Sequence, residues 1–248
     1  MRFVLISDIH GNSIALDAVI RDVDASGGAD RWWVLGDIIA LGHDPVGTLE
    51  RLTALPNIEF LTGNTERYVV EGTRPYPRLN DVANDSSLLP RLVEVTASFA
   101  WTRGMITNAG WYQWINKLPR TLRHTLPDST RLLGVHASPQ SCDGIGIDTR
   151  ISDDDLISML KGCEADVVFG GHTHDAVDRI AGTVRAVNLG SVSNSNRPDR
   201  KASYVVVTAN ETTYDVAHRT VQYDHQEVIA ALDAVHHPAG EYLKQFQR

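Results

Sequence analysis

Residues 1–12, MRFVLISDIHGN, decide the fold of this chain. The continuous apolar run over residues 3–6 is typical of a strand buried on both faces of a sheet, and it ends abruptly before Asp8 and His10. Residues 16–23 follow with apolar side chains at helical spacing. The pattern predicts a strand that delivers polar side chains to a loop, followed by a helix, as in an α/β fold.

Four further apolar runs also end in polar side chains. They are residues 32–35 before Asp37, 58–61 before Asn64, 131–135 before His136, and 167–169 before His172 and His174. Loops beyond the carboxyl ends of strands converge on one crevice in open α/β folds. We therefore expect side chains from five strand ends to share a single site.

The polar side chains at these strand ends are of the types that bind metal ions. Imidazole nitrogens with carboxylate or amide oxygens, and no thiolate, suit manganese, iron, cobalt, nickel or zinc better than calcium. Seven groups are too many for one ion, whereas two ions about 3.5–4 Å apart that share a carboxylate would use them all. We assign the bridge to Asp37. The predicted metal ligands are Asp8, His10, Asp37, Asn64, His136, His172 and His174.

The rest of the chain fits one domain over residues 1–248, of which 42% are hydrophobic. Residues 67–127 show helical patterns, several tryptophans and no strand-like run, so they predict a helical insertion beside the site. We interpret the tryptophans as core residues, with stacking on a nucleobase as the alternative. Runs rich in β-branched residues then predict further strands, one closing helix follows over residues 228–235, and the last dozen residues are expected to be loose.

The charge and the first residues limit the possible partners. With 31 acidic and 23 basic side chains the net charge is −8, which argues against a stable nucleic-acid partner or an anionic membrane surface. The apolar stretch at the start is too short for a secretory signal or a membrane span. We expect a cytoplasmic protein, and the sequence leaves its oligomeric state open.

Taken in order, these motifs resemble those of the calcineurin-like metallophosphoesterase superfamily. The matching motifs are Asp8-x-His10, Gly36-Asp37, Gly63-Asn64, His136 and Gly171-His172-x-His174. The stretches Ser7–Asn12, Asn188–Val192 and Lys201–Tyr204 are similar to the small bacterial and archaeal phosphodiesterase-like branch. The resemblance implies a four-layer α/β/β/α sandwich of two mixed sheets.

The resemblance also implies roles for the residues. It places Asp8, His10, Asp37 and His174 around one metal, and Asp37, Asn64, His136 and His172 around the other. Hydroxide bridging two divalent ions would attack a phosphodiester or an activated phosphoester, with manganese as the expected metal and iron, nickel, cobalt or zinc as alternatives. Asp37, Asn64 and His136 are the candidate catalytic residues. Candidate contacts to a small phosphoester or nucleotide are Asn12 and the loop residues Arg197, Arg200 and Lys201, whose alternative is a solvated surface loop.

One position departs from the superfamily pattern. The histidine that commonly follows the motif asparagine and protonates the departing oxygen is replaced by Thr65. Threonine is no general acid near neutral pH, so the departure favours aryl, nucleotide or anhydride leaving groups over alkoxides. His43 is a possible substitute or a loop surface residue. The alternatives are a dinucleoside polyphosphate hydrolase, a protein serine/threonine phosphatase, or a catalytically weak scaffold for a protein partner.

Overall fold

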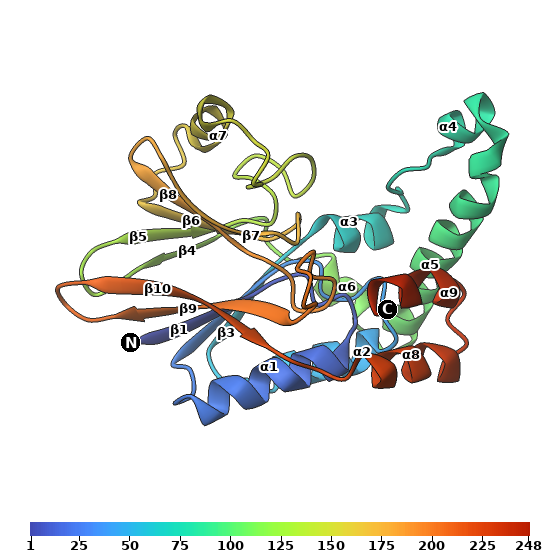
Figure 1. The fold of residues 1–248 in the computed structure, drawn as a ribbon, viewed down its shortest axis with the longest axis horizontal. Helices are drawn as coiled ribbons and strands as arrows, with labels where there is room; N and C mark the ends of the chain where they lie inside the picture. The colour runs from blue at the N-terminus through green and yellow to red at the C-terminus, as the bar shows by residue number, and fades with distance from the viewer.

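Strand β1 (Arg2–Ile6) lies in the middle of a five-stranded sheet in the computed structural model, which describes all 248 residues (Figure 1). Its side chains alternate between two cores. Phe3 and Leu5 are buried between the two sheets of the molecule, while Val4 and Ile6 are buried beneath helices on the opposite face. The predicted burial on both faces is therefore confirmed.

The first sheet has the strand order β10-β9-β1-β2-β3. β1 and β2 pair in parallel, as do β2 and β3, while β9 runs antiparallel to β1 and to β10. The parallel strands consequently end at one edge, where their following loops meet. Besides β1, the strands are β2 (Arg31–Leu35), β3 (Ile58–Leu61), β9 (Ala202–Ala209) and β10 (Tyr214–Val221).

The second sheet has the order β4-β5-β6-β8-β7 and is also mixed. β5, β6 and β8 are parallel neighbours, and β4 and β7 are the antiparallel edges. Fourteen buried residues drawn from both sheets fill the space between them. The strands are β4 (Leu122–Thr125), β5 (Arg131–Gly134), β6 (Val167–Gly170), β7 (Ala176–Ala181) and β8 (Val184–Leu189).

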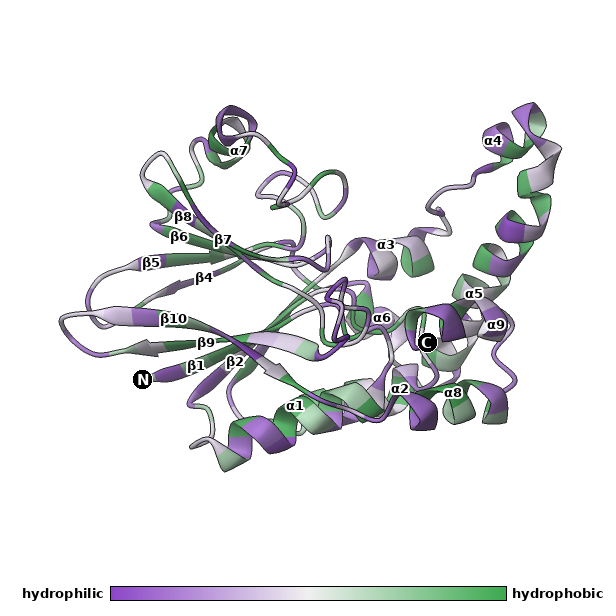
Figure 2. Cartoon of the chain, viewed as in Figure 1, coloured by the Kyte–Doolittle hydropathy of each residue, from purple (hydrophilic) through white to green (hydrophobic).

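Helices cover the outer faces of both sheets. α1 (Ser13–Ala25) and α2 (Pro45–Thr53) pack on the first sheet, and α7 (Asp153–Leu160) packs on the second. Figure 2 shows the hydrophobic and hydrophilic residues alternating along α1, as expected for a helix with one buried side. The four-layer α/β/β/α sandwich of two mixed sheets is confirmed.

The predicted insertion is mostly helical, but it also contains a strand. Its elements are α3 (Asn64–Glu71), α4 (Leu79–Asn84), the 3-10 turn η1 (Ser86–Leu88), α5 (Leu89–Asn108), α6 (Tyr112–Ile115) and then β4. The expectation of no strand in residues 67–127 was therefore wrong. β4 is a four-residue edge strand with the polar sequence LRHT, so no apolar run marks it. α4 and most of α5 project away from the sheets (Figure 1).

The insertion's tryptophans behave as packing residues. The Trp114 ring packs edge-on against Phe60 with 5.0 Å between ring centroids, and Trp111 packs against Trp114 at 5.5 Å. Both rings contact the core beneath the first sheet. None of the helices combines the length and the apolar character required to cross a membrane.

The last residues are ordered, contrary to the expectation of a loose end. After α8 (His225–Ala234) come α9 (Gly240–Leu243) and the 3-10 turn η2 (Lys244–Phe246). Leu243 is buried in the core shared with α5, and Lys244 forms ion pairs with Asp233 and Glu241. The sequence pattern missed these turns because each is too short to show helical periodicity.

Candidate metal centre

Backbone hydrogen bonds bring the predicted ligand loops together. The Asp8 N–H donates to the Gly36 carbonyl at 3.1 Å, and the His10 N–H donates to the Asp37 carbonyl at 2.9 Å. The His172 N–H donates to the Asp8 carboxylate at 2.9 Å. The loops after β1, β2 and β6 thus meet at one edge, as the strand-end pattern predicted.

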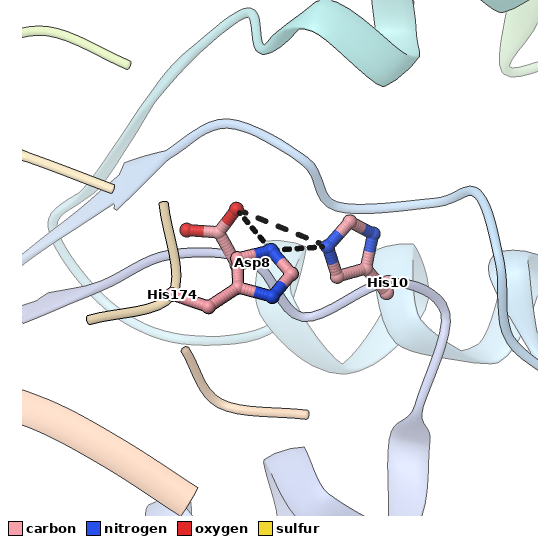
Figure 3. Close-up of side chains that lie close together, drawn as sticks. All are labelled: Asp8, His10 and His174. Atoms are coloured by element: carbon pink, nitrogen blue, oxygen red, sulfur yellow. Dashed lines mark hydrogen bonds and ion pairs between the residues drawn. The ribbon is translucent and has the colours of Figure 1, made fainter. Parts of the chain in front are cut away.

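Asp8, His10 and His174 form the first group of side chains (Figure 3). His174 Nε2 lies 3.2 Å from Asp8 Oδ1 and 3.2 Å from His10 Nε2, and His10 Nε2 lies 3.8 Å from Asp8 Oδ1. Asp8 is fully buried, and its Oδ1 has no hydrogen-bond partner. A buried carboxylate oxygen without a donor is costly, so this atom is placed to meet a cation.

The second group surrounds the amide of Asn64. Asn64 Oδ1 lies 2.9 Å from His136 Nε2 and 2.9 Å from His172 Nδ1. His136 Nε2 also lies 3.3 Å from Asp37 Oδ1. Ligand atoms that follow four different strands, β2, β3, β5 and β6, therefore face one another over short distances.

Asp37 lies between the two groups. Its Oδ1 faces His136 at 3.3 Å, while its Oδ2 faces His10 at 3.9 Å. A carboxylate whose two oxygens face different donor groups has the arrangement of a bridging ligand. The seven predicted side chains are thus gathered in two adjoining sets that share Asp37.

In each candidate histidine ligand, one ring nitrogen donates a hydrogen bond that fixes the orientation of the ring. Backbone carbonyls accept hydrogen bonds from Nδ1 of His10, His136 and His174 at 3.0, 2.7 and 2.8 Å. In His172 it is Nε2 that donates, to the Gly144 carbonyl at 2.8 Å. Because a carbonyl can only accept, the other nitrogen of each ring is left to bind a metal.

The buried carboxylates and histidines of the centre shift one another's pKa values. Burial disfavours an imidazolium, but the Asp37 carboxylate outweighs burial and raises the pKa of His136 to about 10. Burial likewise opposes the charge on Asp37, yet the positive His136 holds the pKa of Asp37 well below its usual range. In the same way the pKa of His174 is raised and that of Asp8 is lowered. Histidine protons occupy the place of positive charge that a metal would supply.

Most of the candidate ligands adopt a backbone conformation that is rare outside glycine. Asp8, His10, Asp37, His172 and His174 all have positive φ angles, between 52° and 73°. Such left-handed residues cost about 1–3 kcal/mol each and persist only where their surroundings hold them. Backbone strain is therefore frequent at the residues whose side chains would bind metal.

Glu66 holds two of the ligand loops and was not assigned a role from the sequence. Its buried carboxylate accepts backbone N–H bonds from Asp37 at 2.7 Å, Ile38 at 2.8 Å, Ile39 at 3.3 Å and Gly63 at 2.9 Å. Burial and the nearby Asp37 charge raise the pKa of Glu66 to about 7, while these donors oppose the rise. The signal was its position three residues after Gly63, at the start of a helix.

Gly63 allows the closest approach in the site. A Cβ atom at this position would collide with the Asp37 carboxylate and with the Asp37 backbone nitrogen. Only glycine lets the loop after β3 approach the Asp37 carboxylate so closely. In the first turn of α3, the Thr65 N–H donates to Asp37 Oδ1 at 2.9 Å and helps to orient the carboxylate.

Three of the four predicted substrate contacts have partners within the protein. Asn12 caps α1 through the Ala15 N–H, and its amide donates to Ser193. Arg197 pairs with Asp199 at 3.0 Å, and Lys201 lies 3.8 Å from the same carboxylate. Arg200 follows in the same loop with a φ of 49°. Substrate contact by Asn12, Arg197, Arg200 and Lys201 stays a prediction.

Glu66→Gln should weaken the centre without changing the side chain's size. The amide group would place its own donor against backbone N–H groups, which leaves buried donors unsatisfied at about 1–3 kcal/mol each. We expect the free energy of unfolding to fall by ~2 kcal/mol or more, with less bound metal. Chemical denaturation and metal analysis would measure both. The exposed Glu50→Gln is the control, and wild-type metal content with unchanged stability in Glu66→Gln would contradict the role.

Metal binding should release protons and weaken as the pH falls. With a pKa of about 10, the metal-free His136 is protonated at neutral pH, whereas a metal requires the neutral ring. Affinity should therefore rise with pH from about 5 to 9. Calorimetric titration of metal-free protein with Mn²⁺ at pH 7, in two buffers of different ionisation enthalpy, counts the released protons. Equal heats in both buffers would show that no proton is displaced.

Comparison with known proteins agrees with this geometry. Residues 1–212 match the model of the calcineurin-like phosphoesterase superfamily domain. A metallophosphoesterase from Sphaerobacter thermophilus superposes with a TM-score of 0.73 at 24% identity, over 100% of this chain and 98% of that one. A hypothetical protein from Pyrococcus horikoshii superposes with a TM-score of 0.80 at 17% identity, over 99% and 97%.

These structural likenesses show a shared fold. No curated protein matches the sequence. The family match spans far more than half of the chain and includes every candidate ligand from Asp8 to His174. The chain therefore belongs to the calcineurin-like phosphoesterase superfamily and is a metallophosphoesterase, a hydrolase of phosphoric esters.

Proposed function

We propose that this protein hydrolyses phosphodiesters or activated phosphoesters with two divalent metal ions, of which manganese is the first candidate and iron, nickel, cobalt and zinc are the others. The observation that carries the proposal is the position of Asp37. Its two oxygens face His10 and His136, which belong to different donor groups. One carboxylate shared by two sets of ligands is the arrangement of a two-metal phosphoesterase.

Each ion would have its own set of side chains. Asp8, His10, Asp37 and His174 would hold one, and Asp37, Asn64, His136 and His172 would hold the other. When bound, divalent ions lower the pKa of water and offset negative charge on phosphoryl oxygens. The chain's own contribution is to orient the donor atoms through the carbonyls behind the histidines and to bury the carboxylates.

Thr65 supports a preference for good leaving groups. It is 3% exposed, its hydroxyl has no hydrogen-bond partner, and it carries no group that gives up a proton at neutral pH. His43 is buried beside Ser13, with 3.2 Å between His43 Nε2 and the serine hydroxyl, and so takes part in packing. Leaving groups that depart as stable anions need no proton donor, which favours aryl, nucleotide or anhydride substrates.

Two of the alternatives from the sequence, the scaffold and the protein phosphatase, have less support. A scaffold without turnover is disfavoured because all seven donor side chains are present and brought together. A protein phosphatase must expel an alkoxide, which the threonine at position 65 does not assist. The cytoplasmic location and the lack of a nucleic-acid partner stay predictions.

Metal-dependent hydrolysis is the first test of this function. Chelator-stripped protein reloaded with manganese, nickel, zinc or iron should hydrolyse bis-p-nitrophenyl phosphate faster than p-nitrophenyl phosphate. Asp37→Ala should lower turnover by at least about a hundredfold and reduce bound metal, because it removes the shared ligand. The exposed Asp215→Ala is the control and should behave as the wild type. Inert protein that binds two metals would favour the scaffold instead.

Thr65→His should extend the range of leaving groups. An imidazole at this position would supply the missing proton donor, so turnover of phenyl phosphodiesters should rise by at least about tenfold relative to p-nitrophenyl esters. Thr65→Gln places a side chain of similar size without an acid and is the matched control. Equal ratios for the two variants would show that the identity of residue 65 does not govern leaving-group preference.

A further inference from the structure

A cavity of about 270 Å³ opens beside the candidate metal ligands, and we call it the side pocket. One wall is the ligand set itself, since His10, Asp37, Asn64, His172 and His174 line it. The remaining walls come from the helical insertion and from the C-terminal segment. They include Tyr76, Arg91, Ser98, Phe99, Tyr242 and Leu243.

The walls of the side pocket away from the ligands are rich in aromatic rings. Phe99 is almost fully buried and packs edge-on against Tyr68, with 5.8 Å between ring centroids. The Tyr242 ring also lines the pocket, and one of its faces is covered by the Arg91 guanidinium, whose carbon is 3.0 Å from the ring centroid. Flat apolar surfaces of this kind favour a planar aromatic ring, which can stack or pack edge-on against them.

Three residues that line the side pocket contain buried polar atoms without a partner. They are the hydroxyls of Thr65 and Ser98 and Nη1 of Arg91. Buried polar atoms in folded proteins are nearly always hydrogen-bonded, and each exception requires an explanation. Because these atoms have almost no accessible surface, a ligand with hydrogen-bond acceptors would supply the missing partners only after a side-chain rotation turned them toward the pocket.

One basic side chain contributes positive charge to the side pocket. Arg91 is the one lysine or arginine in its lining. The Glu94 carboxylate forms an ion pair with Nη1 at 3.6 Å, a distance too long for a hydrogen bond, so an anionic group in the pocket would compete with Glu94 for the guanidinium. The pocket thus combines aromatic walls with one cation, next to the site that would hold phosphate.

We propose that the side pocket binds the organic group of the substrate, a planar aromatic ring that carries a hydrogen-bond acceptor or a negative charge. This inference rests on the proposed phosphoesterase function, because the phosphate must lie at the metal centre for the ring to reach the pocket. The cavity is close to the lower limit of the ~300–1,000 Å³ typical of small-molecule sites. It therefore selects one ring system of a small phosphoester, with the size and chemistry of an aryl or nucleobase group.

Ligand binding without hydrolysis tests the side pocket directly. Manganese-loaded full-length protein is titrated calorimetrically with methylphosphonate, phenylphosphonate and 4-phosphonobenzoate, whose carbon–phosphorus bonds replace the ester bond. We expect phenylphosphonate to bind at least about tenfold more tightly than methylphosphonate because of its ring. The carboxylate of 4-phosphonobenzoate should add about tenfold more through Arg91. Equal affinities for the three ligands would overturn the proposal, and this comparison needs no variant.

Substitutions in the side pocket test whether it causes the affinity gained from the ring and from the carboxylate. Arg91→Gln should remove only the carboxylate's gain, and Tyr242→Leu should reduce the ring's gain, while methylphosphonate binding stays unchanged. Arg103 lies 5.1 Å from the Tyr112 ring and does not line the pocket, so Arg103→Gln is the matched control. A loss of equal size in Arg91→Gln and Arg103→Gln would refute the assignment of Arg91.

Binding and hydrolysis distinguish the side pocket from the phosphoesterase activity. Protein that binds the aromatic phosphonates selectively but hydrolyses no ester under any metal would refute the proposed function and support the side pocket. Protein that hydrolyses esters but shows no preference for the ring would refute the side pocket and leave the phosphoesterase function standing.

Discussion

The burial of two carboxylates side by side is the constraint on which the rest of this structure depends. Asp8 and Asp37 are 0% and 3% exposed, and together with His136 they place donor atoms within 4.8 Å of one another. Like charges at this separation in a buried site are strongly unfavourable unless positive charge is close. No lysine or arginine is paired with either carboxylate, so imidazolium groups or metal ions must balance them.

The backbone is organised around the same constraint. Five of the candidate ligands have left-handed conformations, and the loops that contain them are held by hydrogen bonds between neighbouring strand ends and by the Glu66 carboxylate. These conformations lower the stability of the fold, but they direct the candidate ligand side chains toward one another. The two sheets with their filled interface supply the rigidity that this requires.

The α/β character and the positions of the candidate ligands follow from local patterns, whereas the four layers were expected only from the resemblance to the superfamily. Apolar runs that end before Asp, Asn or His mark the strand ends, and the continuous apolar run of β1 marks its two buried faces. The role of Glu66 and the edge strand β4 were missed. A carboxylate that caps backbone N–H groups from another loop, and a short polar strand paired only at an edge, are fixed by tertiary contacts that no local periodicity reveals.

Apart from the wall formed by the candidate ligands, the side pocket is lined largely by segments outside the strand-end motifs. The insertion provides Arg91 and Phe99, and Tyr242 lies beyond residue 212, where the family match ends. None of the candidate metal-binding side chains lies in these segments. A substitution in them would therefore alter the shape of the side pocket while the candidate ligands and the backbone that orients them stay in place.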